Sequence, residues 1–359
     1  MANKIMLWPS ARSKFIKADN MKKIYYSAIV LAVVMSFLNY YMYGFMYGVK
    51  LGLMVVVSIV LTRLTEILFY THDKDINRQE AKDLIKKSYP ELTAIVYVLL
   101  IPIGTPLWLV GVGAILATML GKLIFGGFHH MVFHSSLVGV IFVTLGWPGL
   151  VDGVAFINSF DNYLLDLIFN NSFFNETLSI NSTPIAVESM TALGKLMFDG
   201  SMYSFDQLFL GVVPGVVGSG IVLLGIFGYL VFNKAINWIT PTVMIFSFLV
   251  TAFIISLANG YDSIYPLYEL FAGSFLFVVI FISTDPITTP IDTKGKIVFA
   301  IIAGALTIII RNAGKYEEDA GRNGQDSSDQ GSADAAETAQ GTLVDHAEQH
   351  AHDGWHVGT

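Results

Sequence analysis

One long apolar run is followed directly by a cluster of polar side chains, Ser283-Thr284-Asp285-Pro286-Ile287-Thr288-Thr289-Pro290. The two prolines lack a backbone N–H and bend the chain, and the threonines place hydroxyl groups around Asp285. A carboxylate at the boundary of a membrane span either caps the interface or belongs to an ion or cofactor site. Both interpretations of Asp285 and Thr288 are open on these residues alone.

Three histidines, His129, His130 and His134, lie where another apolar run is interrupted. On a continuous helix His130 and His134 would share a face, because they are four residues apart. Such a pair suits a metal site, a proton relay or the axial nitrogens of a haem. Two histidines without a third ligand make a poor zinc site, so no metal site is predicted. We favour the alternative, in which they hydrogen-bond the freed backbone of a broken helix.

Arg63 and Glu66 lie one helical turn apart within the second apolar run. Paired opposite charges cost less to place in a membrane than single charges, so this spacing predicts an ion pair. A role in an ion path and a purely structural role both fit the pair. The chain has no cysteine, which excludes disulfides, thiolate metal sites, cysteine-ligated iron–sulfur clusters and cysteine nucleophiles. No catalytic side chain is predicted.

The elements that hold these residues must be membrane helices. Hydrophobic residues make up 54% of the chain and charged residues only 14%, whereas about a quarter of the residues in a soluble domain are charged. So few charges cannot cover the apolar surface in water, and the mean hydropathy of +0.60 agrees. We therefore predict an all-α, polytopic helical membrane protein.

Nine apolar runs are long enough to cross or enter a bilayer, at about 24–43, 50–70, 91–104, 106–126, 131–149, 206–232, 238–258, 266–283 and 297–310. Several are short or interrupted by glycine and proline, so we expect nine to ten spans with broken helices. Thr105-Pro106 precedes one apolar run and Thr289-Pro290 precedes another. This echo predicts an internal repeat.

The distribution of charge predicts how the chain is oriented. The N-terminus (1–23), the loop 71–90 and the loop 284–296 are basic and should be cytoplasmic, which leaves the polar segment 150–205 extracytoplasmic. The membrane domain covers 24–311. The tail 312–359 has two basic and ten acidic residues and is predicted to be disordered. Nothing in the charge pattern suggests nucleic-acid binding.

Several segments together resemble one family of membrane proteins over about residues 24–316. The run Thr284–Pro290 resembles a T-D-P-x-T-[ST]-P signature, and three further segments agree in order: Gly126–Phe133, Leu208–Gly218 and Asn237–Pro241. The family comprises the flavin-carrying B subunit of the sodium-translocating NADH:quinone oxidoreductase and the D subunit of the Rnf complex. The length of the chain suits the Rnf subunit better.

This resemblance implies a covalent flavin. In the family, a flavin transferase joins FMN through its phosphate to a threonine, and the matching residue here is Thr183. Asn181-Ser182 stands where the family has Gly-Ala, and the alternative is that Thr183 is an unmodified loop residue. A second, non-covalent flavin such as riboflavin is also implied. Further residues expected at cofactor sites are Gly215, Asp285, Thr288, His130 and His134.

The function implied by the resemblance is one-electron relay through FMN, coupled to movement of Na⁺ or H⁺. The chain would act with other Rnf-type membrane and peripheral subunits in the lipid bilayer of the cell membrane and would catalyse nothing complete alone. Ser219-Gly220 stands where the family has Glu-Thr, which puts an ion path at that position in doubt. The alternatives are the B subunit of the quinone reductase and a secondary transporter with broken helices.

Overall fold

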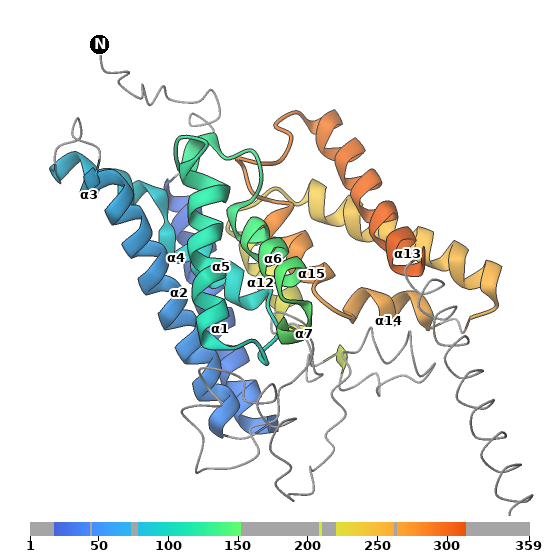
Figure 1. The fold of residues 1–359 in the computed structure, drawn as a ribbon. Coiled ribbons are helices and arrows are strands. Elements are labelled where there is room, and N and C mark those ends of the chain that lie inside the picture. The colour runs from blue at the N-terminus through green and yellow to red at the C-terminus, as the bar shows by residue number, and fades with distance from the viewer. Residues whose placement is uncertain are drawn as a thin grey trace, which may run out of the picture. The chain divides into compact units, whose positions relative to one another are not determined.

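The computed structural model describes residues 18–43, 45–72, 78–151, 208–209, 220–261 and 264–313. These residues are helical and include no strand, which confirms the all-α prediction (Figure 1). The chain divides into a unit of residues 1–308 and a unit of residues 309–359. In the second unit only the end of one helix, up to Ala313, is described. Most of the predicted flavin-bearing loop and most of the acidic tail lie outside the described residues.

Four of the described helices are long and apolar enough to cross a bilayer. They are α1 (Ala18–Tyr43), α2 (Phe45–His72), α13 (Ile239–Asn259) and the helix Thr293–Ala313. A fifth candidate is a broken span, in which Tyr265–Phe271 and Phe275–Ile282 meet at a bend of 64°. The protein is therefore polytopic, as predicted, while other predicted runs form helices too short to pass as single spans.

The shorter elements occupy the breaks between the long helices. In chain order the first are α3 (Arg78–Ser88), α4 (Pro90–Leu99), α5 (Leu107–Thr118) with the π-helix η2 (Met119–Leu123), the 3₁₀-helix η3 (Phe128–His130), α6 (Ser135–Gly146) and α7 (Pro148–Val151). The later ones are α12 (Val222–Phe232), α14 (Tyr265–Phe271), α15 (Phe275–Phe277) and the π-helix η5 (Val278–Ile282).

Local backbone chemistry explains where α4 and η2 are interrupted. Tyr89 adopts a left-handed conformation (φ 48°), and Pro90 then starts α4, where its missing N–H costs nothing. After α4, residues 100–106 are not helical. Pro102 and Pro106 lie in this stretch, where the sequence predicted a gap between two apolar runs. Beyond η2, Gly126 and Gly127 have φ values of 98° and 99°, which side chains other than glycine rarely adopt.

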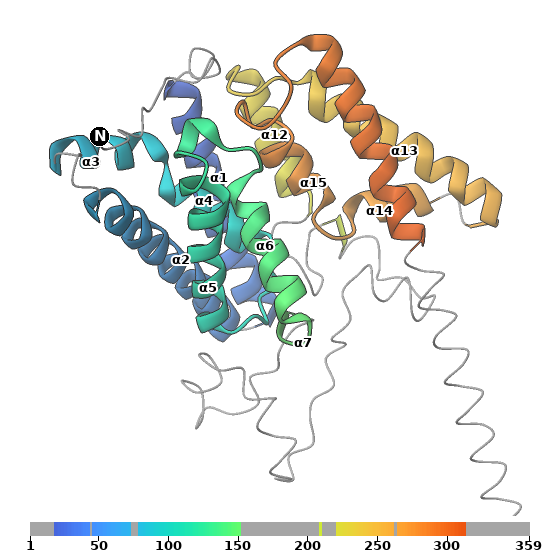
Figure 2. The same ribbon diagram turned by 45° about the horizontal axis from the view of Figure 1, so that its top comes forward.

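The helices α4, α5 and α6 lie side by side and approach closely through glycines (Figures 1 and 2). A Cβ atom added at Gly113 would lie 1.8 Å from the hydroxyl oxygen of Tyr97 and 2.6 Å from a methyl group of Val143. A Cβ atom at Gly139 would lie 2.7 Å from the carbonyl oxygen of Gly113. Small residues thus set the distance between these helices, as is common in membranes.

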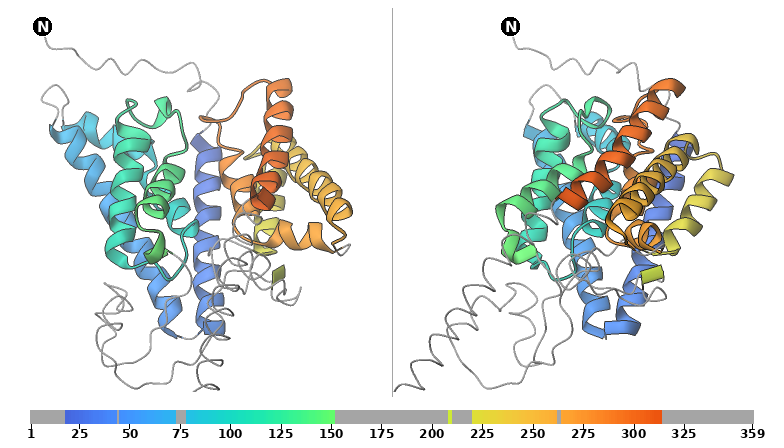
Figure 3. Two further views of the ribbon diagram at one scale, coloured as in Figure 1. Left: turned by 45° about the vertical axis from the view of Figure 1, so that its right-hand side comes forward. Right: turned by 90° about the vertical axis from the view of Figure 1, so that its right-hand side faces the viewer.

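The helix α1 contacts helices from both parts of the chain. It packs on α2 and α4 and also contacts α12. Figure 3 shows α1 between the helices α2 to α6 and the helices α12 to α15. Lys23 near the start of α1 donates a hydrogen bond of 3.0 Å to the carbonyl oxygen of Asn233, which follows α12. A cation at this position stabilises the negative end of the α12 dipole.

Replacing Gly113 by alanine should destabilise the protein, because the new methyl group collides with Tyr97 on the neighbouring helix. Overpacking of this kind costs about 1–3 kcal/mol. Thermal unfolding of the purified chain in detergent should show a lower midpoint for Gly113→Ala. Gly225→Ala is the matched control, since a Cβ at Gly225 meets nothing within 4 Å. Equal midpoints for the two variants would contradict this glycine-mediated packing.

Candidate functional site

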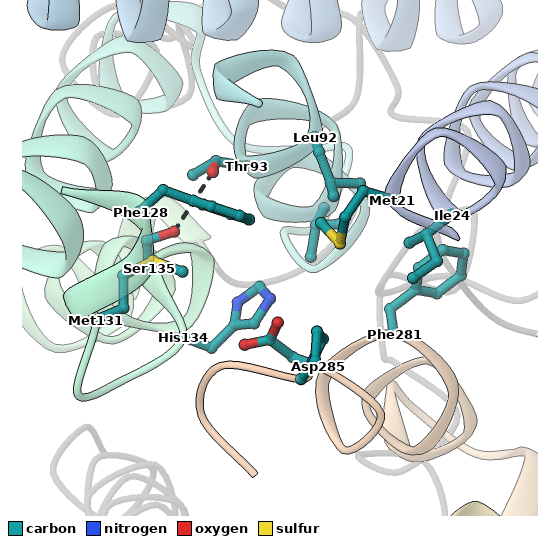
Figure 4. A pocket seen from close by; sticks show the side chains of 12 residues that line it. Met21, Ile24, Leu92, Thr93, Phe128, Met131, His134, Ser135, Phe281 and Asp285 are labelled. Atoms are coloured by element: carbon teal, nitrogen blue, oxygen red, sulfur yellow. Dashed lines mark hydrogen bonds between the residues drawn. The ribbon is translucent and has the colours of Figure 1, made fainter. Parts of the chain in front are cut away.

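A small cavity lies between α1, α4, the segment that precedes α6 and the turn that follows η5 (Figure 4). Its volume of about 30 Å³ is room for about two water molecules. Most of its lining is apolar: Met21, Ile24, Leu92, Val96, Phe128, Met131, Phe281 and Pro286. Four polar side chains also reach it, namely Thr93, His134, Ser135 and Asp285. The cavity thus brings together two segments that the sequence marks as unusual and that are far apart along the chain.

Asp285 is held by a turn made from its own neighbours. Its Oδ2 atom accepts hydrogen bonds from the backbone N–H of Thr288 at 3.2 Å and from the Thr288 hydroxyl at 2.7 Å. The backbone N–H of Thr289 also donates to the carbonyl oxygen of Asp285, at 3.3 Å. Asp285 is buried, with 8% of its surface exposed. The predicted polar cluster therefore forms one compact unit, in which Thr288 fixes the direction of the Asp285 carboxylate.

His134 faces Asp285 across the cavity. Figure 4 shows the imidazole ring of His134 and the carboxylate of Asp285 directed toward one another. The Nδ1 atom of His134 is buried and has no hydrogen-bond partner among the described residues. Leaving such an atom unpaired costs about 1–3 kcal/mol, so a water molecule or an exchangeable proton is expected between the two groups. The volume of the cavity is suited to that purpose.

His130 and His134 lie at a break in the helices, as the sequence indicated, and do not share a helix. His130 ends the short helix η3, and residues 131–134 are not helical. The break begins at Gly126 and Gly127, whose backbone has positive φ values. The Nδ1 atom of His130 is likewise buried without a hydrogen-bond partner in the described part of the chain. Among these residues no three potential metal ligands come together.

A fully buried ion pair lies close to the cavity. The Lys122 ammonium on η2 is 2.6 Å from Oε1 of Glu66 on α2, and neither side chain is exposed. Lys122 also donates to the carbonyl oxygen of Ser88 at 2.6 Å, and the Ser88 hydroxyl donates to Glu66 at 2.9 Å. The ammonium lies 5.3 Å from the centre of the Phe128 ring, and Phe128 lines the cavity.

This ion pair corrects the partner predicted for Glu66. Arg63 does not pair with Glu66; it binds the carboxylate of Glu91 on α4, and 55% of the Arg63 side chain is exposed. On α2, Arg63 faces outward and Glu66 faces inward, so each finds a partner on another helix. No local spacing could reveal Lys122, which lies 56 residues from Glu66 in the sequence.

The remaining predicted site residues, Thr183 and Gly215, lie outside the described residues, and so does the side chain of His129. Of the others, the structure brings Asp285, Thr288 and His134 together, and His130 lies on the segment that leads to His134. Ser135 and Thr93 were not expected at the site. They link α6 to α4 through a hydroxyl–hydroxyl contact of 3.4 Å, supported by a hydrogen bond of 2.9 Å from Ser136 to the Thr93 carbonyl.

Broken helices that gather buried charges and polar cavities define a polytopic membrane protein built around interrupted spans. The chain belongs to the NQR2, RnfD, RnfE family, whose model matches residues 10–320. This match covers the whole described region and includes both the Asp285 turn and the Glu66–Lys122 pair.

Curated relatives agree with this family. The chain is 27% identical over 231 residues to the D subunit of the proton-translocating ferredoxin:NAD(+) oxidoreductase complex of Clostridium ljungdahlii, covering 63% of the chain and 66% of the relative. It is 29% identical over 231 residues to the D subunit of the Na(+)-translocating ferredoxin:NAD(+) oxidoreductase complex of Acetobacterium woodii, covering 63% and 64%. The D subunit of the ion-translocating oxidoreductase complex of Buchnera aphidicola is 28% identical over 291 residues, covering 74% and 80%. The chain thus spans roughly two thirds of the length of the first two relatives.

Replacing Lys122 by methionine should destabilise the protein strongly, because the Glu66 carboxylate then remains buried without its cation. Removing one partner of a buried pair costs about 3–5 kcal/mol. Adding Glu66→Leu to this variant should recover part of the loss, since neither charge then remains. Thermal unfolding in detergent measures both effects. Arg63→Gln serves as control and should shift the midpoint much less, because that side chain is half exposed; a similar shift would argue against a dominant buried pair.

Proposed function

We propose that this chain is the D-type membrane subunit of an Rnf-type complex, which relays electrons through FMN and couples their transfer to movement of Na⁺ or H⁺. The observation that carries the proposal is the family match over residues 10–320, together with relatives named as D subunits of such complexes. The names of the relatives favour the D subunit over the quinone-reductase B subunit. They also favour a part in a complex over an independent secondary transporter.

The covalent FMN is proposed on Thr183, which a flavin transferase would modify. Support comes from the resemblance of the sequence around Thr183 to the flavin-bearing motif of the family. The predicted extracytoplasmic position of that loop also supports it, because a hydroxyl in an exposed polar loop is accessible to a modifying enzyme. FMN supplies the one-electron chemistry, and the protein supplies position and electrostatics.

The second flavin, riboflavin, does not fit the cavity between His134 and Asp285. A ligand of that size needs roughly 300 Å³ or more, whereas the cavity measures about 30 Å³. Asp285, Thr288, His130 and His134 are therefore not assigned to a flavin ring in this arrangement. The cavity is better suited to a water molecule and a proton.

We assign the Asp285–His134 cavity to ion coupling. Inside a membrane, buried titratable groups that face a water-filled cavity commonly mark proton or ion pathways. The Asp285 carboxylate is oriented by Thr288, and the side chain of His134, whose Nδ1 has no hydrogen-bond partner among the described residues, lines the same cavity. A proton held between them, through a bridging water molecule, would balance charge when an electron arrives nearby.

Mass spectrometry of the chain purified from its native host tests the flavin carrier. The peptide that contains Thr183 should carry the mass of one phosphoester-linked FMN, and denatured, washed protein should keep its flavin fluorescence. Thr183→Ala should lose both signals, whereas Thr177→Ala, which changes another threonine of the same segment, should keep them. An unmodified Thr183 peptide in an active complex would refute the covalent carrier.

Replacing Asp285 by asparagine should uncouple ion movement from electron transfer. The amide oxygen can still accept hydrogen bonds from Thr288, so the turn persists while the negative charge is lost. In sealed vesicles that contain the whole complex, uptake of ²²Na⁺ or H⁺ per electron transferred should fall well below the wild-type ratio, because the site can no longer hold a compensating proton on a carboxylate.

Asp292→Asn is the matched control for this experiment. Asp292 is exposed, and its carboxylate accepts a hydrogen bond only from the nearby backbone N–H of Lys294 among the contacts described for it. The same loss of charge at Asp292 should leave the ratio of ions to electrons unchanged. If Asp285→Asn also keeps the wild-type ratio, the cavity has no part in coupling.

A further inference from the structure

A second, much larger cleft lies between α1, α2, α3 and the start of α4. Its volume is about 1260 Å³, and it opens to the surface. The side chains around it come from the first turns of α1, the last turns of α2 and one side of α3: Lys22, Tyr25, Tyr26, Arg63, Ile67, Thr71, Lys82, Asp83, Ile85, Lys86, Lys87, Tyr89 and Glu91, among others. It is separate from the Asp285 cavity except that Phe128 touches both.

Positive charge dominates the lining of this cleft. Five basic and two acidic side chains reach it, and one acid, Glu91, is already paired with Arg63. Lys82, Lys86 and Lys87 on α3 form no salt bridge with any described residue. Lys82 and Lys86 are four residues apart and so lie on the same face of α3. Among the described residues, the cleft therefore offers cations without an ion-pair partner to an anionic ligand.

The other wall of the cleft continues into surfaces that suit acyl chains. On α1, Tyr26, Val30, Val33 and Phe37 are each more than half exposed and follow one another at helical spacing. On α2, Val56, Val60, Leu64 and Ile67 form a similar exposed row. Both rows belong to helices long enough to cross a bilayer, and Tyr26 and Ile67 themselves line the cleft. Apolar stripes thus lead away from the basic cluster along two spans.

The amphipathic helix α3 places its lysines directly after the end of a candidate span. It connects α2 to α4 at the end of a membrane span, and its lysines can extend toward the headgroup region while Ala81 packs with Tyr70 and Leu123. The tyrosines Tyr25, Tyr26 and Tyr89 surround the same opening, and tyrosine is enriched at the boundary between membrane and water.

From these observations we infer that the cleft binds one anionic phospholipid. The phosphate of its headgroup contacts Lys82, Lys86 and Lys87, and its acyl chains lie along the exposed rows of α1 and α2. Basic pockets between membrane helices recognise anionic headgroups in this way, with each lysine adding to the attraction. The inference depends on the membrane location of the chain and is independent of any flavin.

The test compares lipids and variants of the full-length chain in nanodiscs and by native mass spectrometry. Phosphatidylglycerol should remain bound and raise the thermal midpoint of the wild-type protein, and phosphatidylcholine should do neither. The triple variant Lys82→Gln/Lys86→Gln/Lys87→Gln should bind phosphatidylglycerol about a hundredfold more weakly, as expected for three lysines near a phosphate. Binding by the wild type should weaken as salt is added.

A second triple variant, Lys234→Gln/Lys294→Gln/Lys296→Gln, removes the same charge outside the cleft and should bind like the wild type. Should the α3 triple variant fail to fold, the single variant Lys86→Gln should still weaken binding several-fold. Equal retention of phosphatidylglycerol by the wild type and by the α3 variants would overturn the inference. So would equal stabilisation by inorganic phosphate, which would assign the lysines to a free anion.

Discussion

The buried pair of Glu66 and Lys122 is the interaction that fixes the first part of the fold. A single charge at this depth would cost several kcal/mol, so the two side chains must remain together. Their contact ties α2 to the π-helical end of α5, and the Ser88 carbonyl and hydroxyl bring the α3–α4 junction into the same network. The ion pair thus holds together α2, η2 and the α3–α4 junction, the elements between which the local breaks fall.

The same logic explains why α4 can be so short. The end of α3 and the segment after α4 both leave backbone carbonyl groups without helical partners, which is unfavourable away from water. The carbonyl of Ser88, the last residue of α3, accepts a hydrogen bond from Lys122. The carbonyl of Gly104, in the segment after α4, accepts a hydrogen bond of 3.1 Å from buried Lys50 on α2. Two lysines on other helices therefore satisfy free carbonyl groups just before and after this half-helix.

Much of this architecture could be predicted from the sequence, because proline and glycine act locally. The breaks at Pro102 and Pro106, the interruption at Gly126-Gly127 and the compact turn from Asp285 to Thr288 all follow from the preferences of single residues. The membrane class follows from composition. Thr183, Gly215 and the internal repeat remain predictions, the first two because they lie outside the described residues. A local pattern misled where it implied that a partner is near in the sequence. Spacing paired Arg63 with Glu66, whereas both find partners on other helices, because contacts between residues 28 or 56 positions apart depend on packing. The four-residue spacing of His130 and His134 puts them on one face only if a helix continues through both, and residues 131–134 are not helical.

Two buried polar pairs in the described part of the chain, Glu66–Lys122 and Asp285–His134, differ in their capacity to respond to a change of charge. Glu66 and Lys122 are in direct contact at 2.6 Å and neither side chain is exposed, so each charge compensates the other. Asp285 and His134 instead line a space large enough for water, and Nδ1 of His134 has no hydrogen-bond partner among the described residues. Phe128, which lies near the Lys122 ammonium, forms part of the cavity wall and so separates the ion pair from the cavity. Under the proposed function, the ion pair therefore supplies the scaffold and the Asp285 cavity is the place where charge compensation occurs.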